Sequence, residues 1–170
     1  MQINFFLTMA IAGIIPMIVG SIWYNPKVFG NAWMQTVGVS EEKLREGFNP
    51  LLVFGLAYVL SVFIAFALSG IVIHQMGFFG MLQNHFTEEA TQQLFGSVMQ
   101  TYGNEFRTFK HGALHGAIAG IGLALPMVTT NALFERKGFK YIAINSGYWI
   151  VCLILMGGFI CQFADLNSLG

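Results

Sequence analysis

Four stretches of the chain contain no Asp, Glu, Lys or Arg, and these stretches constrain the fold more than any other feature. They run from Met1 to Pro26, from Gly47 to Thr87, from His111 to Phe134 and from Tyr141 to Ala164. A charge-free apolar run of about 20 residues matches an α-helix that crosses a hydrocarbon layer of roughly 30 Å. The pattern therefore predicts an all-α integral membrane protein, a bundle of four transmembrane helices.

The composition favours the same class. The chain of 170 residues is 55% hydrophobic and only 9% charged, whereas a soluble domain has about 25% charged residues. A small soluble domain leaves much of its surface in water, so we expect the lipid bilayer to surround this chain. Its formal net charge is zero, which gives no reason to expect nucleic acid as a partner.

We expect a single transmembrane domain over residues 1–170. The predicted spans are about 3–24, 51–74, 112–134 and 141–164. Asn25-Pro26 and Asn49-Pro50 bound the first connection, because proline lacks an amide donor and disfavours helix in the residue before it. Residues 79–110 form an extramembrane insertion between spans two and three. Within this insertion, Thr87 is predicted to cap a helix that ends near Tyr102.

The basic residues predict the orientation of the chain. Six of them lie in the two short connections: Lys27, Lys43, Arg45, Arg136, Lys137 and Lys140. The long middle segment has only Arg107 and Lys110. Because basic residues favour the cytoplasmic side, we expect both termini and the insertion to be extracytoplasmic.

A stripe of small residues marks the third span. Gly112, Gly116 and Gly120 recur every four residues, and such a stripe lets another helix approach closely. It indicates either an oligomer interface or packing against a helix of the same chain, and we prefer the second interpretation.

All four histidines fall on the predicted outer side: His74, His85, His111 and His115. His111 and His115 are four residues apart and share one helix face, where two imidazoles can bind a metal ion or a haem iron. We prefer an interfacial place for His111 and a structural hydrogen bond for His115. We therefore predict no metal and no cofactor, with His74, His111 and His115 as the alternative ligands.

A second polar group is expected near the inner side. Its members are Tyr24, Asn25, Asn131, Glu135, Asn145 and Tyr148. Amides within a bundle bond across helices and fix their register. The group is interpreted as structural, with a pocket for a polar small molecule or a lipid headgroup as the alternative.

Several sequence features speak against an enzyme. The chain has neither the glycine-rich phosphate loop nor the GxSxG nucleophile motif. No acidic or basic residue lies in the middle of a span, where an ion-coupled transporter usually has an ionisable site. Cys152 and Cys161 lie on one predicted helix, about 13 Å apart along its axis, which is too far for a disulfide.

Several tracts resemble one family of small bacterial membrane proteins, catalogued as domain of unknown function 1761. They are Ile22–Pro26, Phe29-Gly30, Trp33-Met34, Gly38–Ser40, His115, Asn131–Glu135, Ile144–Tyr148 and Met156-Gly157. The resemblance implies a compact four-helix membrane domain without an established activity, located in a bacterial cytoplasmic (inner) membrane. The residues that match the family pattern are Trp23, Tyr24, Asn25, Pro26, His115, Asn131, Glu135, Asn145 and Tyr148. The long segment 79–110 departs from the pattern, as an insertion would.

From the sequence alone, the leading hypothesis is a non-catalytic small membrane protein that acts as a homo-oligomer or as an accessory subunit of a larger membrane assembly. An oligomeric carrier that binds a small solute or a lipid is the first alternative. A metal or haem protein that uses the outer histidines is the second.

Overall fold

The computed structural model describes residues 2–169 and is a bundle of helices. Four helical stretches in this part of the chain are long and apolar enough to cross a membrane: Phe5–Trp23, Pro50–Val72, Phe109–Phe134 and Phe139–Phe163. The all-α class and the number of candidate spans agree with the sequence prediction. Each stretch begins and ends within three residues of the expected position, because the Asn-Pro pairs and the charged turn limit the helices.

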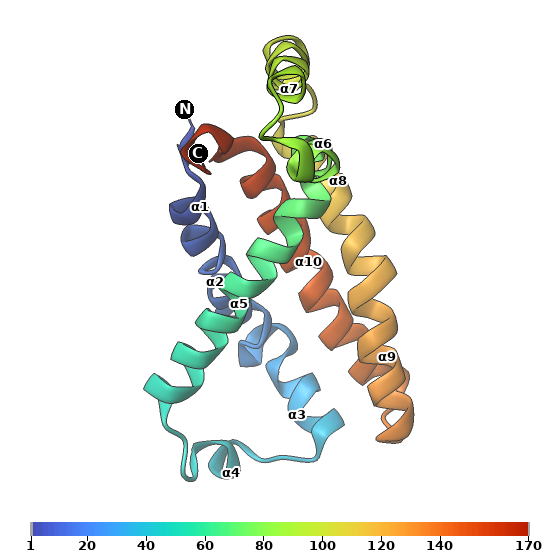
Figure 1. Ribbon diagram of the computed structural model, residues 1–170. Coiled ribbons are helices and arrows are strands. Elements are labelled where there is room, and N and C mark those ends of the chain that lie inside the picture. The colour runs from blue at the N-terminus through green and yellow to red at the C-terminus, as the bar shows by residue number, and fades with distance from the viewer. Residues whose placement is uncertain (1, 170) are drawn as a thin grey trace.

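The fourth span, α10 (Phe139–Phe163), packs against each of the other three. On one side of it lie α1 (Phe5–Ala12) and α2 (Ile15–Trp23), and α5 (Pro50–Val72) crosses it diagonally (Figure 1). On the other side lie α8 (Phe109–Ala119) and α9 (Leu125–Phe134) (Figure 1). The core is centred on buried α10 side chains such as Met156 and Ile160, which pack with Met9 and Ala65.

Contact between α8 and α10 depends on glycine. A Cβ atom at Gly116 would overlap the carbonyl oxygen of Leu153, and one at Gly112 would overlap the carbonyl oxygen of Gly157. At Gly120 the added atom would lie 2.9 Å from the Cα of Ile150. The whole stripe therefore faces α10 of the same chain, and this face is not free for a second copy.

The first and third spans are interrupted near a proline. In span one, α1 ends at Ala12 and α2 begins at Ile15, directly before Pro16. In span three, a π-helical segment, Gly120–Ala124, precedes Pro126. Proline removes one backbone donor and its ring crowds the preceding turn, so both interruptions lie near the two prolines within the candidate spans.

The connection between α2 and α5 is partly helical. A π-helical turn, Pro26–Gly30, leads into α3 (Asn31–Val37), and α4 (Glu41–Arg45) follows. The amide oxygen of Asn25 accepts from the backbone N–H of Lys27 at 2.9 Å, and the hydroxyl of Ser40 caps α4. Side-chain caps of this kind satisfy the first free N–H groups of a helix.

The middle segment departs most from expectation. Helix α5 ends at Val72, and after a bend at Ile73 the chain continues as α6 (His74–Leu82), a 3₁₀ turn (Gln83–His85) and α7 (Glu89–Tyr102). The long apolar helix therefore ends at Val72, and the middle segment begins earlier than the predicted residue 79. The predicted cap at Thr87 is wrong, because Glu88 occupies the cap position and makes no side-chain cap bond.

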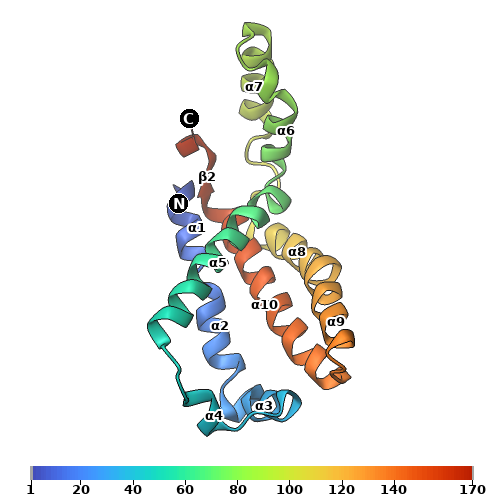
Figure 2. The same cartoon turned by 60° about the horizontal axis from the view of Figure 1, so that its bottom comes forward.

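Both ends of the described chain lie at the end of the bundle that bears α6 and α7 (Figures 1 and 2). There β1 (Ile3–Asn4) pairs in parallel with β2 (Ala164–Asp165), and a 3₁₀ turn, Leu166–Leu169, follows. Helices α3 and α4 and the α9–α10 turn lie at the opposite end. The two short, basic connections therefore share one end of the molecule.

Candidate metal centre

Three of the four histidines meet at the end of the bundle near α6. His74 is the first residue of α6, and His111 and His115 occupy successive turns of α8. The ligand nitrogens of the three imidazoles all lie within 4.8 Å of one another. The fourth, His85, lies apart from them and pairs with Glu88 at 2.8 Å. The structure thus brings together the same three histidines that the sequence suggested as alternative ligands.

The rings stand close enough to bond directly or to share an ion. Nε2 of His74 and Nε2 of His111 are 2.8 Å apart, so in the metal-free protein one imidazole donates to the other. His115 completes the cluster, with its ring centroid 4.9 Å from that of His74 and 4.5 Å from that of His111. Nitrogens bound tetrahedrally to one ion at about 2.0–2.1 Å lie about 3.4 Å apart, so the close pair must open by about half an ångström.

The ligand atoms of the three histidines determine which metal ion or cofactor fits the cluster. Three imidazoles, with no carboxylate or thiolate among them, suit Zn²⁺, Cu, Ni²⁺ or Fe. Three protein ligands leave a fourth position free in a tetrahedral ion. The three rings lie too close together for a haem macrocycle to fit between them. The cluster therefore suits a bare metal ion better than a haem.

Phe106 forms a wall beside the cluster. Its ring centroid lies 6.0 Å from that of His74 and 5.0 Å from that of His111. Its backbone has a φ of 62°, which a phenylalanine adopts only under constraint, at a cost of about 1–3 kcal/mol. The constraint comes partly from Thr108, whose N–H donates to the Phe106 carbonyl at 2.8 Å and whose hydroxyl accepts from the N–H of His111 at 3.2 Å.

Cys161 connects this loop to the end of α5. Its sulfur lies 3.3 Å from the carbonyl oxygens of both Val72 and Phe106 and donates to one or the other. The bend before His74 and the loop before α8 are therefore fastened to one buried residue of α10. Cys161 is unpaired, as the spacing of the two cysteines predicted.

Gln75 connects α6 to the end of α7. Its amide nitrogen donates to the carbonyl oxygens of Tyr102 at 3.3 Å and Glu105 at 3.0 Å. Sequence analysis missed Gln75, Phe106 and Cys161 as supports of the histidines. The only available signal was Gln75 itself, a polar residue within an apolar stretch, which has to find partners when it is buried.

At the opposite end, three of the predicted polar residues meet between α2 and α10. The Tyr24 hydroxyl donates to the amide oxygen of Asn145 at 3.1 Å, and the Tyr24 and Tyr148 rings lie 5.3 Å apart. The Tyr148 hydroxyl donates to the carbonyl oxygen of Pro16 at 3.0 Å. Burial, with smaller contributions from Cys152 and Tyr141, raises the pKa of Tyr24 from 10.0 to about 12. These polar groups satisfy one another across the helix interface.

The other three predicted polar residues lie elsewhere. The side chain of Asn25 caps the turn at Pro26–Gly30, and Glu135 is exposed at the end of α9. Asn131 is also exposed and lines a surface hollow with Pro126, Met127 and Thr130. The structure therefore divides the predicted polar group, and Asn25, Asn131 and Asn145 do not form one common pocket.

Fold and site together define a class of protein: a bundle of four apolar helices, each long enough to span a membrane, with a three-histidine cluster at one end. The sequence model of the family described as protein of unknown function, DUF1761, matches residues 7–161. The chain belongs to this family, and the match runs through the long α6–α7 segment. No curated protein and no solved structure matches the chain.

Proposed function

We propose that this is a multi-pass membrane protein that binds a transition-metal ion through His74, His111 and His115. The observation that carries the proposal is the gathering of three imidazole nitrogens within 4.8 Å, one from His74 and two from residues at least 37 positions further along the chain. Imidazole is the commonest protein ligand for such metals. Two of the ligands, on successive turns of one helix, are already held in fixed relative positions.

Insertion in a membrane is supported by the outward-facing side chains of the candidate spans. On α5, Leu51 is 85% exposed and Phe63 is 66% exposed. Apolar surface in water costs about 25 cal/mol per Å², and a continuous apolar surface of this kind suits lipid. Because the short connections carry most of the basic residues, the rule that basic loops stay inside puts the histidine cluster on the extracytoplasmic side.

The proposal concerns metal binding, and the absence of enzymatic activity stays a prediction. An ion held by three histidines has a further coordination position for water or for a ligand. A partner protein or a small molecule could supply that ligand, which would suit metal delivery or sensing.

The test is metal content in a detergent-purified protein. The protein is first treated with EDTA, then dialysed against Zn²⁺ or Co²⁺ and measured by elemental analysis and by the visible spectrum of Co²⁺. We expect one ion per chain and the intense absorption of four-coordinate cobalt. Replacing His74, His111 and His115 together by Ala should remove both signals. Replacing His85 by Ala is the matched control, because His85 lies outside the cluster, and it should leave both signals unchanged.

Two results would contradict the proposal. One is a protein that retains no ion after dialysis. The other is a loss of bound metal in the His85 control as large as the loss in the triple variant, because that would assign the ion to adventitious surface binding.

The predicted role as a homo-oligomer or accessory subunit also stays a prediction. The glycine stripe is covered by α10, but α6 and α7 project beyond the four-helix body (Figure 2) and expose Met81 and Leu94. Such a projection suits a partner subunit. A single chain per particle in lipid nanodiscs, with no co-purifying protein, would argue against it.

A further inference from the structure

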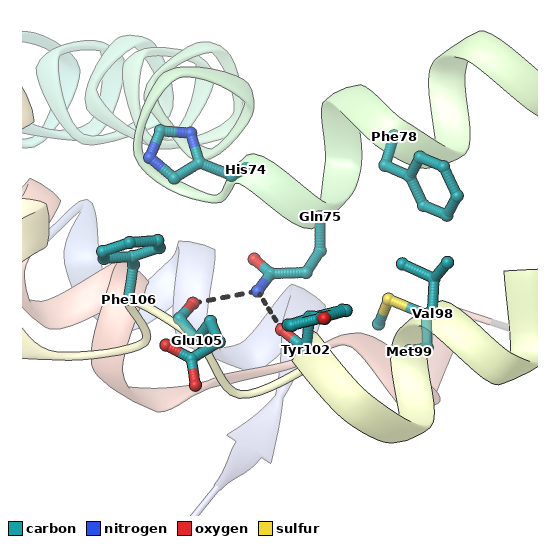
Figure 3. A pocket seen from close by; sticks show the side chains of 8 residues that line it. All are labelled: His74, Gln75, Phe78, Val98, Met99, Tyr102, Glu105 and Phe106. Atoms are coloured by element: carbon teal, nitrogen blue, oxygen red, sulfur yellow. Dashed lines mark hydrogen bonds between the residues drawn. The ribbon is translucent and has the colours of Figure 1, made fainter.

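A groove lies between α6 and the end of α7, directly beside the histidine cluster (Figure 3). Its volume is about 440 Å³, which falls within the range of about 300–1,000 Å³ of small-molecule sites. The lining residues are His74, Gln75, Phe78, Val98, Met99, Tyr102, Glu105 and Phe106. Most of this surface is apolar or aromatic, so an occupant needs an apolar body.

The wall of the groove contains an acceptor that lacks a donor. Gln75 is only 9% exposed, and its amide oxygen has no hydrogen-bond partner within the described chain. The amide cannot be turned over to solve this, because its nitrogen already donates to the carbonyl oxygens of Tyr102 and Glu105 (Figure 3). An unpaired buried acceptor costs about 1–3 kcal/mol, and a ligand that donates a hydrogen bond removes this cost.

The charge of the groove also favours a ligand that donates hydrogen bonds. Glu105, an exposed residue of the lining, carries a negative charge, and no Lys or Arg is among the lining residues. The guanidinium of the adjacent Arg107 is turned away and donates to the carbonyl oxygen of Ala164. Phe78, Tyr102 and Phe106 offer aromatic faces, which attract cations. An anion would find little to pair with here, whereas a protonated amine finds acceptors, a negative charge and aromatic rings.

We infer that the groove between α6 and α7 binds a lipophilic amine, with an apolar and preferably aromatic body and a protonated primary amino group. The body lies against Phe78, Val98 and Met99. The ammonium group pairs with the Glu105 carboxylate and donates to the Gln75 amide oxygen, which is buried in the free protein, so the side chains over that oxygen move when the amine binds. This inference does not rest on metal binding, and its test is performed on metal-free protein.

The experiment is equilibrium dialysis of the detergent-purified full chain in EDTA against protein-free micelles. The probes are naphthylmethylamine and the neutral compound of the same shape, naphthylmethanol. We expect the amine to bind about fivefold more tightly than the alcohol. A partly exposed ion pair gives a gain in affinity of up to about fivefold, and a cation–π contact gives a gain of similar size.

Variants locate the site. Glu105→Gln removes the negative charge and keeps the backbone acceptor, and it should weaken binding of the amine by about fivefold with little effect on the alcohol. Val98→Trp fills the groove and should abolish saturable binding of both probes. Glu89→Gln is the matched control, because it removes a carboxylate from the same hairpin outside the groove, and it should change the affinity by less than about twofold.

Three outcomes would overturn the inference. The first is equal binding of the amine and the alcohol, which would indicate partition into an unselective apolar surface. The second is an equal loss in Glu105→Gln and Glu89→Gln, which would assign the effect to the net charge of the hairpin. The third is saturable binding that survives Val98→Trp, which would place the site elsewhere.

Discussion

Nε2 of His74 and Nε2 of His111 lie 2.8 Å apart, although the two residues are 37 positions apart in the chain. His74 begins α6 directly after the bend at Ile73, and His111 lies in the first turn of α8. Their contact therefore joins the two ends of the long segment that leaves the bundle after α5 and returns at α8. In the metal-free protein the connection is one hydrogen bond, and under the proposed function a metal ion replaces it.

The first prediction concerns His111→Phe, which keeps an aromatic ring but removes both nitrogens. Without metal, the variant should lose about 1 kcal/mol of the free energy of unfolding, the usual net contribution of one hydrogen bond. For the unchanged protein, Zn²⁺ at about 100 times its dissociation constant should add about 2.7 kcal/mol. The variant should gain far less. The measurement is unfolding by a denaturing detergent with and without Zn²⁺.

His85→Phe provides the comparison for this experiment, because His85 pairs with Glu88 outside the cluster. It should keep the full stabilisation by Zn²⁺. If His111→Phe is stabilised as much as the unchanged protein, the ion binds somewhere other than the three-histidine cluster.

The second prediction concerns Gly116→Ala. The added methyl group would overlap the carbonyl oxygen of Leu153, so α8 and α10 must move apart. Overpacking of this kind typically costs about 1–3 kcal/mol. The same denaturant titration should show a loss in this range, with no change in the oligomeric state.

Gly55→Ala is the matched control on α5, because a Cβ atom there meets no other atom within 4 Å. It should be neutral or slightly stabilising, since alanine favours helix over glycine. A change in oligomeric state in Gly116→Ala, without loss of stability, would instead show that the stripe contacts another chain.

The spans could be predicted because the constraint on them is local and strong. A hydrocarbon layer admits only helices of sufficient length whose backbone groups are bonded within the segment, and the Asn-Pro pairs mark where two helices end or begin. The bend at Ile73 has no such signal. Only His74 and Gln75 interrupt the apolar run from α5 into α6, and no proline lies there. The position of the bend depends on contacts such as that between Cys161 and Val72, which only the folded chain reveals.

The inner polar group was predicted from residues that lie near one end of their spans, on the condition that the spans pack side by side. A π-helical segment adds one residue to a turn and so rotates the following residues by about 100° relative to a regular helix. Gly120–Ala124 is such a segment, and it lies between the glycine stripe and Asn131. The part of the group that does form consists of Tyr24, Asn145 and Tyr148. No π-helical segment interrupts α10 between Asn145 and Tyr148.

The third prediction follows from the burial of Tyr24. Its pKa of about 12 in the folded protein exceeds the ordinary 10.0, so the unfolded chain releases this proton at a lower pH. The contribution of Tyr24 to stability is therefore complete below about pH 10 and declines as the pH rises toward 12. Absorbance of tyrosinate during an alkaline titration should show a late step, and Tyr24→Phe should lower the amplitude of that step by one tyrosine. An unchanged titration curve in Tyr24→Phe would contradict the assignment.

The fourth prediction concerns the side of the membrane on which the histidines lie. Both ends of the described chain share one end of the bundle with α6 and α7, and six of the eight Lys and Arg residues belong to the connections at the other end. Since basic connections stay in the cytoplasm, a reporter fused after Gly170 should be extracytoplasmic. Alkaline phosphatase there should be active, and a fluorescent protein that folds only in the cytoplasm should stay dark.

The matched fusion within the α9–α10 turn, after Gly138, should give the opposite pair of signals. Cytoplasmic fluorescence from the fusion after Gly170 would reverse the orientation and place the three histidines on the cytoplasmic side.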